Sequence, residues 1–261
     1  MLLFIWYLLI FVFGLAAGSF LTAYTWRWPR GISIAKGRSI CDNCKKKIAW
    51  YDNIPLFSYI ALGGRCRNCG KKISLRYPLI ELSTGVLFVL TITLLGGFGR
   101  LGELGFLLTA YYLLLAAVLI AIFIIDLENQ LIPDGLVFLI FTLNVSLLVL
   151  SSDKNFYQIM FTGFLSAFFF LFLNLVTRGR GMGLGDAKLV LALSPILGYP
   201  QTIVWIFLSF IIGAVVGLLL IAVGKASFGK HIAFGPFLVI AFFITLFWGD
   251  LLVNTFLPYL G

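Results

Sequence analysis

The sequence predicts an all-α polytopic membrane protein of about eight transmembrane helices, with a small four-cysteine module between the first two. Three observations lead to this fold class. Of the 261 residues, 61% are hydrophobic and 11% are charged, whereas soluble domains carry about 25% charged residues. The apolar residues form runs of roughly 20, the length of a membrane-spanning helix. One polar segment, residues 26–76, holds all four cysteines.

Eight apolar runs are predicted to cross the membrane as helices, because lipid cannot satisfy the backbone of any other single segment. In chain order they cover residues 2–25, 77–95, 104–125, 133–150, 156–176, 187–197, 202–223 and 233–258. The first is longer than the apolar part of a secretory signal and is expected to be retained. The sixth is short, so seven spans with a re-entrant sixth segment is the alternative.

The positive charge predicts the orientation. Twelve of the 19 lysine and arginine residues lie in segment 26–76. If that segment is cytoplasmic, the inner side carries 17 basic residues, counting Lys188 near the start of the sixth run, and the outer side carries only Arg100 and Lys154. This split follows the positive-inside rule and predicts a multi-pass protein of the cytoplasmic membrane. The net charge of +9 is therefore expected to meet anionic lipid headgroups and not nucleic acid.

The four cysteines form two Cys-x2-Cys pairs, Cys41/Cys44 and Cys66/Cys69. Two such pairs about 20 residues apart can close one tetrahedral four-thiolate zinc site. Redox thiols and a metal-free module are the alternatives, although a reducing cytoplasm disfavours disulfides. A site with four protein ligands has no open position, so the zinc is expected to be structural.

Two aspartates are predicted to meet at the inner end of the bundle. Asp126 ends the third apolar run, and Asp186 opens the sixth after Gly181-Met182-Gly183-Leu184-Gly185. An acid at the edge of a span is costly and is a candidate functional group. The alternatives are that Asp186 caps its helix and that Asp126 is a solvated loop acid. Gly183 and Gly185 allow close backbone approach, and Asp134 is either a capping acid or a support for the pair.

Two carboxylates without a catalytic type of metal site favour acid–base activation of water. One aspartate would take a proton from water while the other protonates a leaving amine. A transporter that binds ions through these aspartates, with a zinc-ribbon module, is the alternative in a different class. Such a protein is expected to show inverted repeats, which the sequence does not display.

Several blocks together resemble the bacterial type IV prepilin peptidases, which are membrane aspartyl proteases with a Gly-x-Gly-Asp motif. The blocks appear in the family's order and extend over nearly the whole chain. They are GSFL at 18–21, the cysteine block at 41–82, IIDLENQLIPD at 124–134, GMGLGDAKL at 181–189 and FGPFL at 234–238.

The resemblance implies an enzyme that cuts a short basic leader from prepilins or secretion pseudopilins after a glycine, on the cytoplasmic side. It also implies that the enzyme methylates the new N-terminus with S-adenosylmethionine. The family's catalytic aspartates correspond to Asp126 and Asp186, and its zinc ligands to the four cysteines. Arg76 and Glu81 are candidates for the methylation site. The expected domains are a first helix (1–25), a methylation-associated zinc module (26–76) and a peptidase domain (77–261).

Overall fold

The computed structural model describes residues 2–34, 37–95, 105–150, 155–179, 181–224 and 232–256. The chain divides into two compact units, Met1–Ala121 and Ile122–Gly261. Every long element in the described residues is helical, so the predicted all-α class is confirmed. The basic residues Lys36, Arg100, Lys154, Arg180, Lys225 and Lys230 lie outside the described residues.

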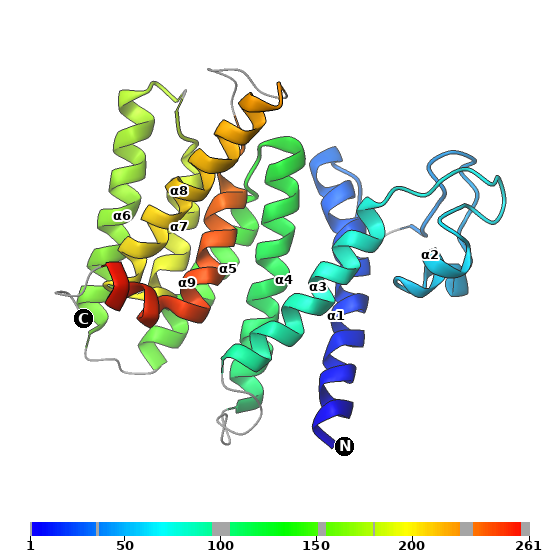
Figure 1. Ribbon diagram of the computed structural model, residues 1–261, viewed down its shortest axis with the longest axis horizontal. Coiled ribbons are helices and arrows are strands. Elements are labelled where there is room, and N and C mark those ends of the chain that lie inside the picture. Colours follow the sequence, from blue (N-terminus) through cyan, green and yellow to red (C-terminus); the bar gives the residue numbers. More distant parts are fainter. Residues whose placement is uncertain are drawn as a thin grey trace. The chain divides into compact units, whose positions relative to one another are not determined.

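The first unit contains two packed helices, a cysteine module and most of a third long helix. Helix α1 (Leu2–Arg27) continues into the short 3-10 helix η1 (Trp28–Arg30), and α3 (Arg76–Leu94) crosses α1 (Figure 1). Gly14 and Gly18 make this crossing close, because a Cβ on Gly14 would lie 2.7 Å from the Cα of Gly85. The module follows η1 and precedes α3 in the sequence, and it contains η2 (Trp50–Asn53) and α2 (Phe57–Ala61).

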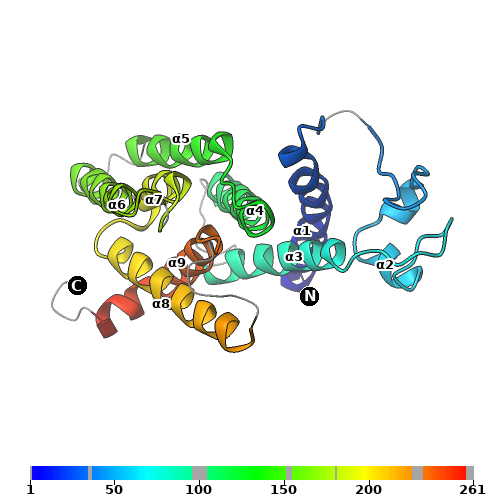
Figure 2. The same ribbon diagram turned by 90° about the horizontal axis from the view of Figure 1, so that it is seen from above.

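Helix α4 (Gly105–Asn129) runs from the first unit into the second. The second unit continues with α5 (Asp134–Leu150), α6 (Phe156–Val176), α7 (Leu184–Leu197), α8 (Gln201–Ala222) and α9 (Gly235–Phe256). Helix α7 is the interior helix of this unit, since it packs against α5, α6, α8 and α9. Figure 2 shows α7 beside α6 and next to α5.

Six of the described helices are long and apolar enough to cross a membrane: α1, α3, α4, α6, α8 and α9. Helix α5 has 17 residues and α7 has 14, so α7 is about 21 Å long at 1.5 Å per residue and is shorter than a hydrocarbon core of about 30 Å. The chain is therefore a multi-pass helical protein, but the predicted count of eight spans is not confirmed. Helix α7 is apolar because neighbouring helices bury it.

Candidate functional site

Asp126 lies in the last turn of α4, where Gln130 ends the helix with a φ of 55°. The residue is only 5% exposed, which rules out the alternative that Asp126 is a solvated loop acid. The backbone N–H of Gly235, at the start of α9, donates to Asp126 Oδ2 over 2.9 Å. A buried carboxylate needs such a donor, because an unpaired one would lose its hydration without compensation.

Asp186 is the third residue of α7 and is 6% exposed. Its Oδ2 accepts the N–H of Gly183 over 3.0 Å, so Gly183 is the N-cap residue and Asp186 reaches back to it. This is the carboxylate half of a capping box. The alternative that Asp186 is itself the N-cap is therefore wrong, because the N-cap lies three residues earlier. The Asp186 side chain nevertheless pairs the N–H of that N-cap residue.

Ile132, in the linker between α4 and α5, connects the surroundings of the two aspartates. A Cβ on Gly185 would lie 2.9 Å from the Ile132 Cβ, and a Cβ on Gly235 would lie 3.3 Å from its Cδ1. The starts of α7 and α9 therefore both contact this one side chain. Asp126 is hydrogen-bonded to Gly235 and Asp186 to Gly183, so both aspartates lie beside this shared contact. The second unit thus brings the predicted pair together.

Two polar side chains at the end of α6, one in its last turn and one directly after it, hold the glycine-rich loop that precedes Asp186. Asn174 Nδ2 donates to the carbonyl of Met182 over 2.6 Å, and the N–H of Gly181 donates to Thr177 Oγ1 over 3.0 Å. These residues fix the loop at both sides of Gly181-Met182. Sequence reasoning missed them, although an asparagine near the end of an otherwise apolar run was a visible signal.

Asp134 is the first residue of α5 and pairs with Lys188, whose Nζ lies 2.7 Å from Asp134 Oδ1. Lys188 follows Asp186 by two residues on α7. Both side chains are more than half exposed, so this ion pair is worth little in stability. It does place a carboxylate and an ammonium group at the open end of α7. The supporting role of Asp134 stays a prediction.

The four cysteine side chains of the module form one cluster in the first unit. All four Sγ atoms lie within 4.8 Å of one another, and those of Cys41 and Cys69 are 3.9 Å apart. Thiolates bound to zinc at about 2.3 Å in a tetrahedron would be about 3.8 Å apart. The cluster therefore has the donor set and the spacing for a four-thiolate metal site.

The two cysteine pairs use the same turn. The N–H of Lys45 donates to the carbonyl of Cys41, and the N–H of Gly70 donates to that of Cys66, each over 2.9 Å. The residue after each second cysteine has a positive φ, 56° at Lys45 and 67° at Gly70. Each turn directs the two thiols of its pair to the same side, so the two turns face each other across the cluster.

Arg76 and Glu81 contact the protein backbone in the first unit. Arg76 donates to the carbonyl of Thr22 over 3.2 Å and to Thr25 Oγ1 over 2.7 Å, which ties α3 to α1. Glu81 is 8% exposed and accepts the N–H of Leu56 over 2.8 Å. These contacts give both side chains a structural role in the first unit.

Gly235 belongs to the FGPFL block at 234–238. No pattern in the sequence predicted its contact with Asp126. A Cβ at this position would lie 2.6 Å from Asp126 Oδ2, so only glycine permits the approach. A multi-pass helical protein with two buried aspartates at adjoining helix ends fits the class of membrane aspartyl peptidases.

Comparison with known proteins gives the family within this class. Residues 12–95 match the bacterial peptidase A24 N-terminal domain, and residues 113–218 match the type IV leader peptidase family. The chain therefore belongs to the type IV leader peptidase family, and the resemblance seen in the sequence is confirmed.

Several curated relatives carry the name prepilin leader peptidase/N-methyltransferase. The one from Pseudomonas aeruginosa is 38% identical, with 85% of this chain and 76% of the relative aligned. The one from Aeromonas hydrophila is 33% identical over 97% of this chain and 94% of the relative. The one from Neisseria gonorrhoeae is 34% identical, covering 88% and 86%. No solved structure matches the chain significantly.

Proposed function

We propose that this chain cleaves the leader from type IV prepilins or pseudopilins and N-methylates the new N-terminus. The two activities are those named for its relatives. The observation that carries the peptidase is the pair of buried carboxylates, Asp126 and Asp186, each fixed by a glycine N–H. The family match disfavours the ion-coupled transporter.

The geometry supports hydrolysis by a water held between the carboxylates. The glycine N–H groups occupy Oδ2 of each aspartate, which leaves Oδ1 of each for water or substrate. One carboxylate takes a proton from the water, whose oxygen attacks the scissile carbonyl carbon. The protonated partner then gives its proton to the leaving amine. The two carboxylates titrate as one unit, so the roles belong to the pair.

The module is proposed to hold one structural zinc ion through Cys41, Cys44, Cys66 and Cys69. When bound, the ion would crosslink the two turns and contribute folding free energy. Methylation requires S-adenosylmethionine and a deprotonated α-amine, whose usual pKa is about 8. Arg76 and Glu81 are the candidates for that second site, because they lie beside the module at the start of α3.

We propose that the module and the aspartates face the cytoplasm in the inner membrane. Segment 26–76 holds twelve basic residues and two acidic ones, Asp42 and Asp52, and such loops stay on the cytoplasmic side. Anionic headgroups are its expected partner, and no nucleic-acid partner is proposed. The pilus and secretion context follows from the prepilin substrates.

A cleavage assay with a purified prepilin in detergent or lipid tests the proposal. Asp126→Asn and Asp186→Asn should each lower kcat/KM by about 10²–10⁴-fold or more, because each removes a proton-transfer group. Asp250→Asn is the matched control, since Asp250 is an exposed carboxylate of α9 that accepts a hydrogen bond from Gln201. Robust cleavage by either folded active-site variant would exclude this pair.

A further inference from the structure

One part of the cysteine module exposes large apolar side chains. We call residues 50–61 the interfacial segment; it comprises η2, the linker 54–56 and α2. Its exposed apolar side chains are Trp50 (77%), Tyr51 (48%), Ile54 (41%), Phe57 (67%) and Ile60 (68%). We propose that the interfacial segment inserts into the boundary between headgroups and acyl chains of the bilayer.

The first argument is the depth at which the segment is tied to α3. The N–H of Leu56 donates to Glu81 Oε2 over 2.8 Å. Glu81 lies five residues beyond Arg76, where α3 begins, so the tie is about 7 Å along the helix at 1.5 Å per residue. Because α3 is a candidate span, the linker is held inside the length of a membrane-crossing helix.

Helix α1 gives the same depth independently. A Cβ on Gly18 would lie 2.7 Å from the Cα of Glu81, so Gly18 and Glu81 are level. Gly18 lies nine residues before Arg27, the end of α1, which is about 13 Å along the axis. Both candidate spans therefore extend past Leu56 toward the basic end. Phe57 directly follows the anchored residue Leu56, and Ile60 lies about one helical turn further on.

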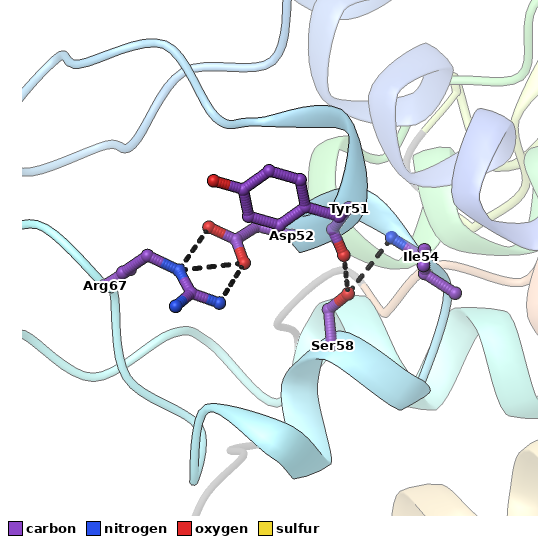
Figure 3. A network of polar contacts seen from close by, with 5 residues as sticks. All are labelled: Tyr51, Asp52, Ile54, Ser58 and Arg67. Carbon is purple, nitrogen blue, oxygen red and sulfur yellow. Dashed lines mark hydrogen bonds and ion pairs between the residues drawn. The ribbon is translucent and has the colours of Figure 1, made fainter.

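The second argument is that the segment pairs several of its backbone polar groups internally while its large apolar side chains stay exposed. Ser58 Oγ donates to the carbonyl of Tyr51 over 2.7 Å and accepts the N–H of Ile54 over 3.1 Å (Figure 3). Asp52 accepts hydrogen bonds from Arg67 at 2.7–3.1 Å. Arg67 stands between Cys66 and Cys69, so this contact joins the segment to the cysteine cluster.

The third argument is charge and side-chain type. Segment 26–76 has twelve basic and two acidic residues, a net formal charge of 12 − 2 = +10. Aromatic side chains with adjacent cations are typical of protein segments at an anionic membrane surface. A lipid surface therefore fits the segment in both charge and polarity. This deepens the proposed lipid contact by naming the residues that make it.

Photo-crosslinking in the full chain tests the proposal directly. Benzoylphenylalanine replaces Phe57 in one sample and the exposed Lys46 in the other, in nanodiscs of phosphatidylglycerol and phosphatidylethanolamine. Mass spectrometry should find lipid adducts at position 57 in several-fold excess over position 46. Adducts only to protein at position 57, or no adduct there, would overturn the proposal.

Two substitutions of Glu81 test the hydrogen bond that holds Leu56 at this depth. Glu81→Gln retains an oxygen that can accept the Leu56 N–H, whereas Glu81→Ala does not. The yield of lipid adduct at position 57 should fall several-fold in Glu81→Ala and persist in Glu81→Gln. Equal yields in folded samples of both would contradict the role of Glu81. The readout uses no peptidase activity, so failure here and failure of the proposed function are distinguishable.

Discussion

At the scale of single residues, the site depends on glycines next to carboxylates. Gly183 and Gly235 each donate their N–H to one aspartate, and a Cβ would lie 3.1 Å and 2.6 Å from the respective carboxylate oxygens. The lack of a side chain is thus as important as the donor itself. Ile132 leaves no room for a larger side chain at Gly185 or Gly235. These small residues therefore set how closely the starts of α7 and α9 approach Ile132.

Gly235→Ala should reduce prepilin cleavage by about 10²-fold, because a displacement of about 1 Å in a catalytic group has that effect. The added methyl group would have to move Asp126 or the start of α9. Gly135→Ala is the control, since nothing lies within 4 Å of a Cβ there. The measurement is kcat/KM for one prepilin at equal amounts of folded enzyme. Unchanged cleavage by Gly235→Ala would show that the contact does not position Asp126.

In the module, the hydrogen bonds from Arg67 hold the pKa of Asp52 below its usual value. A lowered pKa in the folded state means that the pair stabilises the module above the unfolded pKa of about 3.9 and that this stabilisation is lost as pH falls through the folded pKa. We expect Asp52→Asn to lower the melting temperature of the module slightly at neutral pH. The difference from the parent should shrink as the pH falls through the lowered pKa of Asp52; a difference that stays constant with pH would contradict the assignment.

At the scale of elements, α7 is a short helix that α5, α6, α8 and α9 surround. Its interior position requires polar ties as well as apolar packing. Asn144 of α5 is 3% exposed, and its Nδ2 donates to the carbonyl of Ala192 over 2.6 Å. This bond fixes α7 against α5 and, through α7, the position of Asp186.

Asn144→Leu should destabilise the protein by about 0.5–1.5 kcal/mol, because it removes a buried hydrogen bond between α5 and α7. Thermal unfolding in detergent, followed by tryptophan fluorescence, measures the effect. Thr142→Val is the control, because Thr142 is an exposed residue of the same helix whose hydroxyl donates to the carbonyl of Phe138 in its own turn. A loss no larger than that of the control would show that the Asn144 bond contributes little.

The cysteine module is the other element whose stability can be tested separately. Removal of zinc by a chelator should expose segment 37–75 to trypsin, because the bound metal supplies much of the folding free energy of such small modules. Intact protein should contain one zinc ion per chain by elemental analysis, and Cys44→Ser should lose it. Helices of the unit Ile122–Gly261 should stay resistant. Equal trypsin sensitivity with and without chelator would refute a structural role.

At the scale of the whole molecule, sequence alone predicted most helix bounds closely. The expected run 156–176 is α6, and 133–150 differs from α5 by one residue. This success has a physical cause, since lipid requires long apolar helices and polar residues mark their ends. The number of spans was less predictable. Burial by other helices makes α7 as apolar as lipid exposure would, and composition cannot distinguish the two environments.

The sequence predicted the acidic residues of the candidate site but not the residues that hold them in place. Asp126 and Asp186 stood out because each lies at the end of an apolar run, and the cysteine spacing predicted the cluster that the structure contains. The contact of Asp126 with Gly235 joins residues 109 positions apart, and no local pattern encodes such a distance. The same holds for Glu81, whose acceptor role depends on the backbone of Leu56.

The central claim is that Asp126 and Asp186 act as one catalytic unit, and a double-substitution cycle tests it most directly. Cleavage of one prepilin is measured for Asp126→Asn, Asp186→Asn and the double variant. Residues that act as a unit give strongly non-additive effects, so the double variant should be no slower than the slower single variant. Losses in log kcat/KM that simply add would show that the two aspartates act independently and would contradict the account.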